Sequence, residues 1–391
     1  MFVSCLLSPP RRYPVRVFRL SLALAALAAV GLMAPLSASG ASLGVAADAS
    51  LTGGSTVGNA SAATALHLTW ARVDVSWASV APSQPKGARI PTSSGYVWTS
   101  VDTQLAAAAS LGSGTQVLLS VSGTPDWARA DRGAGGSVGD PAWMPRRASW
   151  QNFVAALVTR YNGRFAAIEI WPQPNLQRSL RPQRLAGRLV GAGLFKILTK
   201  LATVEIRKVS ATAPIVSGGL ARTDPASTTD TPPVTFLRSM SRTRMLFDVV
   251  GMRLVPPTGS EGPSDPTNLS ITDSAGIVAA IDSYWPGSLK SVWLTGYGVP
   301  SGPATNGLSS ATQSVGISSF LTATANPRVG LAIWNSLANT AAAPYEGILL
   351  APTANPFVAP AAGLDPAWDT WTTILPVPVP APEPTPPTPP V

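Results

Sequence analysis

The chain has 391 residues, of which 45% are hydrophobic and only 12% are charged, and its formal net charge is +9. One cysteine (Cys5) and one histidine (His67) exclude a disulfide framework and a Cys/His zinc cluster, and no G-x-S-x-G motif accompanies His67 to build a Ser-His-Asp hydrolase. The composition is that of a globular protein, for which we expect neither a metal nor a cofactor.

The N-terminal segment has the layout of a secretory signal peptide. Four arginines between residues 11 and 19 precede an uncharged run over residues 20–36, and small residues follow at 37–42. We expect residues 1–41 to be a signal peptide and the mature protein to be secreted or held at the cell envelope; the alternative is an uncleaved membrane anchor. Removing this segment leaves 24 basic and 19 acidic residues without a basic cluster beside aromatics, so nucleic acid is not an expected partner.

Between residues 42 and 375, short apolar runs alternate with helical patterns, which indicates repeated βα units. Strands are predicted at 43–47, 68–74, 116–121, 166–171, 214–218, 247–252, 291–295 and 329–334. Helices are predicted at 58–66, 98–111, 148–161, 185–210, 234–244, 273–284, 310–325 and 366–373. This succession predicts an α/β fold, a single (β/α)8 TIM barrel over residues 42–375. A doubly wound sheet is the main alternative, but no G-x-G-x-x-G motif or P-loop follows any strand.

The C-terminal residues 376–391 contain nine prolines, a composition that favours polyproline II. We expect a disordered spacer that associates the protein with the cell envelope. A ligand for a proline-recognition module is the alternative.

Five motifs follow one another at the carboxyl ends of the predicted strands. They are WARVDVSW (70–77), GTPDWA (123–128), IEIWPQPN (168–175), FDVVGMR (247–253) and VWLTGYG (292–298). Their order resembles the retaining glycosidases of glycoside hydrolase clan A, families 39 and 5 in particular, which carry T-P-x-W-A, Y-E-I-W-N-E-P-N and W-x-T-E-F-G at these places. The resemblance covers about residues 42–373 and implies an active site at the carboxyl ends of the strands.

The same resemblance implies two catalytic glutamates, and this sequence has neither. The family's acid/base position, after the fourth strand, is Gln173, and its nucleophile position, at the end of the seventh, is Gly296. Pro172 and Arg253 stand where the family has an asparagine and a histidine. Because retaining hydrolysis needs two carboxyl groups about 5–5.5 Å apart, we expect a pseudoglycosidase. Gly296 should then leave an emptied pocket for water, a substituted sugar or an anion held by Arg253.

Tryptophan rings stack on the apolar faces of sugars, and the chain has 12 tryptophans. We expect Trp127 and Trp334 to be accessible in a glycan-binding cleft, with Gln173 and Asn175 orienting hydroxyl groups. Glu169 lies deeper on the fourth strand, where we expect a buried carboxylate paired with a cation such as Arg72. The residues predicted to bind substrate are Arg72, Trp127, Trp171, Asn175, Arg253 and Trp334.

Three functions stay open at this point. The first is a pseudoglycosidase that binds a cell-envelope or extracellular polysaccharide or oligosaccharide. The second is an active O-glycosyl hydrolase with displaced carboxylates, for which Asp74, Asp126 and Glu346 are the candidates. The third is an envelope scaffold or interaction module that kept only the barrel. The sequence alone does not decide whether the chain is an enzyme.

Overall fold

The computed structural model describes residues 40–54, 56–131, 139–241, 246–255, 266–288, 290–299, 310–338, 348 and 366–374. Apart from Gly40 and Ala41, the predicted signal peptide lies outside these ranges, and so does the Pro-rich tail at 376–391. Among the helices within these ranges, none is both long and apolar enough to span a membrane.

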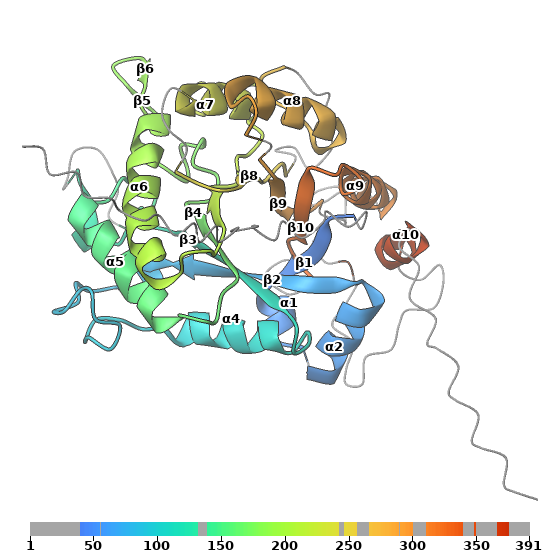
Figure 1. Cartoon of the computed structure of the whole chain (residues 1–391), viewed down its shortest axis with the longest axis horizontal. Helices are drawn as coiled ribbons and strands as arrows, with labels where there is room; N and C mark the ends of the chain where they lie inside the picture. The colour runs from blue at the N-terminus through green and yellow to red at the C-terminus, as the bar shows by residue number, and fades with distance from the viewer. Residues whose placement is uncertain are drawn as a thin grey trace, which may run out of the picture. The chain divides into compact units, whose positions relative to one another are not determined.

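Eight parallel strands form the centre of the fold (Figure 1). Their bounds are β1 (Ser42–Ala46), β2 (Leu68–Ser76), β3 (Gln116–Ser122), β4 (Ala167–Ile170), β7 (Ile215–Ser217), β8 (Val250–Met252), β9 (Val292–Tyr297) and β10 (Val329–Trp334). The sheet order, β7-β4-β3-β2-β1-β10-β9-β8, follows the chain around a ring. Isolated bridges from Val216 to Val249 and from Leu220 to Met252 join its two ends. The strands therefore form a nearly closed parallel barrel, which confirms the prediction of a (β/α)8 fold.

Helices cover the outside of this barrel (Figure 1). Their bounds are α1 (Ala49–Thr52), α2 (Thr56–Ala65), α3 (Trp77–Val80), α4 (Thr99–Ala109), α5 (Arg147–Arg160), α6 (Gly191–Val209), α7 (Pro233–Met240), α8 (Ser274–Tyr284), α9 (Ser310–Ala323) and α10 (Pro366–Ile374), with 3-10 turns at Asp126–Ala128 and Ile271–Asp273. In α6, the buried residues Phe195, Leu198 and Ala202 recur every three or four positions, which gives the helix one apolar face.

The predicted helix over 185–210 is wrong in its first part. Residues 184–189 form an antiparallel hairpin, β5 (Arg184–Leu185) and β6 (Arg188–Leu189), and α6 begins only at Gly191. Ala186 and Gly187 adopt left-handed φ angles of 47° and 76°. Two consecutive residues with positive φ are typical of the tight turn that joins twisted antiparallel strands, so the local chain reverses before the helix can start.

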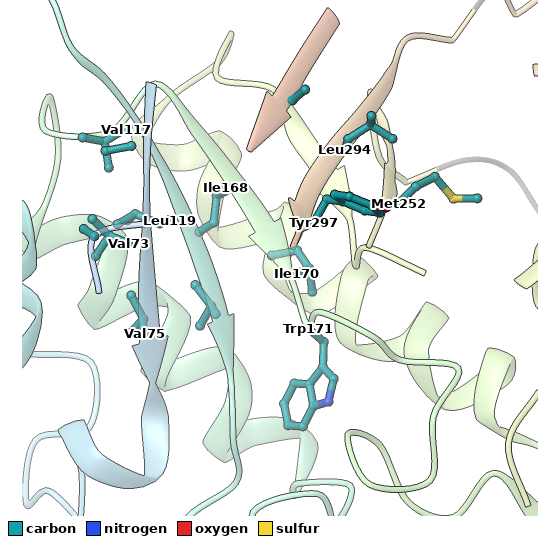
Figure 2. Packing of buried hydrophobic residues seen from close by; sticks show 14 of the residues in the cluster. Val73, Val75, Val117, Leu119, Ile168, Ile170, Trp171, Met252, Leu294 and Tyr297 are labelled. Atoms are coloured by element: carbon teal, nitrogen blue, oxygen red, sulfur yellow. The ribbon is translucent and has the colours of Figure 1, made fainter. Parts of the chain in front are cut away.

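Alternation of side chains along the strands separates two cores. On β2, Val73 and Val75 belong to the larger core between strands and helices, whereas Arg72 and Asp74 have the opposite parity. Figure 2 shows part of this outer layer on β2, β3 and β4. The outward-facing side chains therefore pack against the helices, and the alternating side chains, such as those of Arg72 and Asp74, face the barrel interior.

A second, smaller core fills the amino-terminal half of the barrel interior. Its buried members are Leu118, Ala167, Val216, Val249, Trp293, Leu331 and Ile333. Trp70 packs against it, with its ring edge-on to Trp293 at a centroid distance of 5.3 Å. Because this apolar layer fills that end, inward-facing polar side chains gather at the carboxyl ends of the strands, where barrels of this fold carry their sites.

Candidate functional site

Four charged side chains meet at the carboxyl end of the barrel, and we call Arg72, Asp74, Glu169 and Arg253 the mouth cluster. Arg72 forms a two-pronged ion pair with Asp74, with Nε 3.1 Å from Oδ1 and Nη2 3.1 Å from Oδ2. Nη2 of Arg253 lies 3.3 Å from Oε2 of Glu169 and 3.7 Å from Oδ1 of Asp74. Two positive and two negative charges therefore balance within the cluster.

Glu169 is fully buried at the base of the mouth cluster. Its carboxylate accepts hydrogen bonds from Ser120 Oγ at 2.5 Å, Thr295 Oγ1 at 2.5 Å and the backbone N–H of Gly219 at 2.8 Å. The expected buried carboxylate is confirmed, but its cation partner is Arg253 rather than Arg72. A buried charge is tolerated when it is paired and hydrogen-bonded in this way, so Glu169 ties β3, β4 and β9 together.

Asp74 carries the accessible carboxylate of the cluster, with 51% of its side chain exposed. The surrounding protein atoms desolvate it, which works to raise its pKa. The charges of Arg72 and Arg253 outweigh this effect and, with the hydrogen bonds from Arg72, hold the pKa of Asp74 below its ordinary value. Asp74 is therefore ionised at neutral pH. Burial and the like charge of Arg72 lower the pKa of Arg253.

The space over Gly296 is occupied, which corrects the expectation of an emptied pocket. A Cβ atom at this position would lie 2.7 Å from Arg72 Nη1, 2.8 Å from Arg253 Nε and 2.9 Å from Asn335 Oδ1. Arg72 Nη1 is held there because it donates to Thr295 O at 2.7 Å and to Asn335 Oδ1 at 3.1 Å. Two guanidinium groups and an amide therefore lie over the backbone of β9 where a longer side chain would stand.

Gln173 lies on a strained turn just after β4. Trp171 and Gln173 both have φ angles of 55°, which is uncommon for residues other than glycine. The turn is held by hydrogen bonds from Trp171 N to Val121 O at 2.8 Å and from Gln173 N to Gly219 O at 2.9 Å. The half-buried Gln173 side chain accepts a hydrogen bond from Arg178 Nη2 at 3.5 Å. Strain that the surroundings fix in this way is found most often at functional sites.

Two tryptophans predicted to bind substrate lie in the core instead. Trp171 is fully buried, and its Nε1 donates to Ser179 O at 2.7 Å. Trp334 is also fully buried and packs edge-on against Phe320 of α9 and Trp371 of α10. The prediction that Trp334 is accessible is wrong, because its ring lies among the helices rather than at the barrel mouth.

Asn175 is a third predicted ligand residue that the structure buries completely. Its Nδ2 donates to Ala221 O and to Thr231 O, both at 2.8 Å, and its Oδ1 accepts from Ala221 N at 2.9 Å. Both amide hydrogens are used, so Asn175 joins the segments that follow β4 and β7 and does not orient a sugar hydroxyl in this structure.

Trp127 and Asp126 share the 3-10 turn that follows β3. Trp127 is only partly buried, and its Nε1 donates to Ala81 O at 2.8 Å. Asp126 accepts hydrogen bonds from Gly139 N at 2.9 Å and pairs with Arg129 at 3.4 Å. Among the described residues, no hydrogen bond or ion pair joins Asp126 to the mouth cluster. Glu346, the third candidate carboxylate, lies outside the described residues.

Ser120, Thr295 and Asn335 contact the mouth cluster but were not among the predicted substrate-binding residues. Each lies near or just past the end of its strand and points into the barrel, because it follows an inward-facing apolar residue by two positions. These apolar residues are Leu118 before Ser120, Trp293 before Thr295 and Ile333 before Asn335. That two-residue spacing is the signal that could have identified them. In the part of the chain that the structure describes, no group of three or more His, Cys, Asp and Glu side chains could hold a metal ion.

Glycoside hydrolases are among the solved structures with a similar backbone. A family 39 glycoside hydrolase from the gut symbiont Bacteroides cellulosilyticus WH2 matches with a TM-score of 0.56 and 14% identity, covering 85% of this chain and 62% of that one. GH5_18 from Streptomyces cattleya, in complex with GlcNAc, matches with a TM-score of 0.54 and 14% identity, covering 87% of this chain and 80% of that one. A β-galactosidase from the psychrophilic Marinomonas ef1 matches with a TM-score of 0.54 and 14% identity, covering 85% of this chain and 59% of that one.

No protein-family model matches the sequence, and no curated protein matches it. The chain spans 55% of a glucosidase from Croceicoccus marinus and 62% of the family 39 enzyme, which is less than two thirds of either. At these low identities the likeness concerns the backbone alone. The described chain has the eight-stranded parallel barrel fold that these glycoside hydrolases share.

Proposed function

We propose that the protein is exported and binds a polysaccharide or oligosaccharide at the barrel mouth without hydrolysing it. The observation that carries this proposal is the covering of Gly296 by the guanidinium groups of Arg72 and Arg253. In glycosidases that the sequence resembles, a nucleophilic glutamate stands at the matching position. A barrel with this architecture and without that carboxylate lacks the group that would attack a bound sugar.

The acid–base chemistry of the mouth supports the same conclusion. Retaining hydrolysis needs one carboxyl group that stays protonated and another that attacks, about 5–5.5 Å apart. Asp74 is ionised because its pKa is lowered, and Glu169 is buried and hydrogen-bonded on both oxygens. Gln173 can donate a hydrogen bond but has no ionisable proton. Loss of a general acid alone typically costs about 10²- to 10⁴-fold in rate.

Groups that suit sugar hydroxyls remain at or near the mouth. The half-exposed carboxylate of Asp74 is a strong hydrogen-bond acceptor, and the half-buried amide of Gln173 both donates and accepts. Trp127, after β3, packs edge-on against the buried Trp77 and leaves part of its apolar ring accessible. A few polar groups beside an aromatic ring are typical of small-molecule and sugar sites.

A hydrolase with displaced carboxylates is the second candidate, and the accessible, ionised Asp74 is the observation that favours it. Asp74 could act as a base or nucleophile, but it would need a partner acid. Asp126 is engaged with the backbone of Gly139 and with Arg129, which argues against it as that acid. One experiment distinguishes this candidate and the scaffold hypothesis from sugar binding without hydrolysis.

The experiment measures binding and cleavage on one purified sample. Wild-type protein, Asp74→Asn and Asp282→Asn are screened on an array of envelope and extracellular glycans, and released reducing ends are assayed. Asp282 is the matched control, because it is also half-exposed and paired with an arginine, Arg328 at 3.0 Å, but lies on α8 outside the barrel. We expect binding that Asp74→Asn weakens about tenfold and Asp282→Asn leaves unchanged, without release.

The other outcomes separate the alternatives. Release of reducing ends that Asp74→Asn abolishes would favour the displaced hydrolase, and absence of both binding and release would favour the scaffold. Export is tested independently by N-terminal sequencing of the protein recovered outside the cytoplasm. We expect the mature chain to begin at Ala41 or Ser42.

A further inference from the structure

The β5–β6 hairpin is a positively charged element in the connection between β4 and α6. Figure 1 shows it projecting at the end of α6. Arg184 and Arg188 are exposed on its two strands, and Leu185 between them has 64% of its surface accessible. An exposed apolar residue flanked by arginines is a surface that suits an anionic ligand with apolar faces.

Gln183 fixes the base of this hairpin. Its fully buried side chain donates from Nε2 to Pro174 O at 2.7 Å and to Leu180 O at 2.8 Å. Its backbone carbonyl accepts from the N–H groups of Val190 and Gly191 at 2.8 and 3.0 Å. A Cβ on Gly191 would lie only 2.4 Å from Gln183 Oε1, so the close approach depends on glycine. The hairpin is therefore held in place before any ligand arrives, which lowers the entropic cost of binding.

Three exposed arginines of this region, Arg178, Arg184 and Arg188, have no carboxylate partner among the described residues. Arg181, which lies among them in the sequence, pairs with Asp140 at 3.0 Å. Arg178, which lies in the same connection between β4 and α6, instead donates to Gln173 Oε1. Guanidinium groups left without a carboxylate in the protein are free to bind one from a ligand.

We propose that the ligand is an acidic polysaccharide whose uronic acid carboxylates pair with Arg184 and Arg188 while a neighbouring sugar lies beside Gln173. This inference rests on the proposed function, because the mouth must bind a sugar for the two contacts to belong to one chain. A nucleic acid is disfavoured because residues 177–191 carry no aromatic side chain on which a base could stack. A membrane surface would not explain why Arg178, in the same connection, is hydrogen-bonded to Gln173 just after β4.

The test compares Arg184→Gln/Arg188→Gln with Lys200→Gln/Arg238→Gln in the full-length protein. The control removes the same charge from exposed positions on α6 and α7, so it separates local pairing from net charge. Affinity is measured by calorimetry for three uronate polymers (polygalacturonate, alginate and hyaluronate), for methyl-esterified polygalacturonate and for neutral galactan. We expect at least one uronate polymer to bind more tightly than the uncharged polymers, with an affinity that salt weakens.

The hairpin variant should weaken uronate binding about tenfold or more, because charge-assisted contacts are lost, and the control should not. Both variants should keep the thermal unfolding midpoint of the wild type, since the replaced side chains are exposed. Unchanged uronate affinity in the hairpin variant, or an equal loss in the control, would overturn the assignment of the hairpin.

The two proposals fail in different ways. If galactan binds and no uronate polymer binds better than the uncharged polymers, the acidic ligand is wrong and the proposed sugar binding stands. If none of these polymers and no glycan of the array binds, both proposals fail. Equally tight, hairpin-dependent binding of single-stranded DNA or of phosphatidylglycerol vesicles would show a general anion surface and would also overturn the inference.

Discussion

Replacing Gly296 by alanine probes the packing of the barrel mouth directly. The added Cβ would lie 2.7 Å from Arg72 Nη1 and 2.8 Å from Arg253 Nε, whereas ordinary contacts at such positions are 3.4–4 Å. Arg72 can move away only by weakening its hydrogen bonds to Thr295 O and Asn335 Oδ1. Overpacking of this kind costs about 1–3 kcal/mol, and a weakened bond from a charged donor adds to it, so we expect the free energy of unfolding to fall by about 2 kcal/mol.

Urea unfolding followed by tryptophan fluorescence measures this change as a lower midpoint at an unchanged m-value. Gly193→Ala in α6 is the matched control, because a Cβ there meets nothing within 4 Å. It should leave stability unchanged or raise it by up to about 1 kcal/mol through helix propensity. A Gly296→Ala protein as stable as the wild type would mean that the mouth is open at this position and that the arginines do not cover it.

Substitutions at three further residues, Glu169, Asp74 and Trp334, are measured by urea unfolding. Glu169→Ala should lower the free energy of unfolding by about 3–5 kcal/mol, because it leaves the buried charge of Arg253 without its nearest carboxylate. Glu169→Gln should lower it by less. Equal stability of Glu169→Ala and wild type would contradict this role of Glu169. Because folding lowers the pKa of Asp74 from 3.8, its ionised form stabilises the protein above about pH 4, and this contribution is lost as the pH falls through the folded-state pKa. The stability difference between wild type and Asp74→Asn should therefore shrink between pH 7 and acidic pH, and a difference that grows on acidification would be inconsistent with this pairing. Trp334→Ala should cost about 3–5 kcal/mol, with the glycan affinity of the folded protein unchanged, whereas lost affinity at unchanged stability would place Trp334 in the cleft.

The barrel could be predicted because its signals are local. Each strand is a short apolar run with a turn or helix signal on either side, and on β2 the alternation of Arg72 and Asp74 with Val73 and Val75 already distinguishes the two faces. The β5–β6 hairpin was missed because apolar residues before Gly191 fit a helical period, while the turn at residues 186–187 depends on two left-handed backbone conformations.

The site was harder to predict because it depends on long-range packing. The covering of Gly296 needs side chains from residues 72, 253 and 335, which only barrel closure brings together. For Trp334, the strand pattern did not show that its ring faces the helices rather than the mouth. The structure places Arg72 and Arg253 at the mouth and Trp127 after β3, and their contact with a ligand stays a prediction.

Binding without cleavage is tested most directly by mass spectrometry of a bound oligosaccharide after prolonged incubation with stoichiometric wild-type protein. We predict that saturable binding is accompanied by recovery of the oligosaccharide at its full length, over the whole pH range in which the protein is folded. Shortened products that appear with the wild-type protein and not with Asp74→Asn would contradict the proposal.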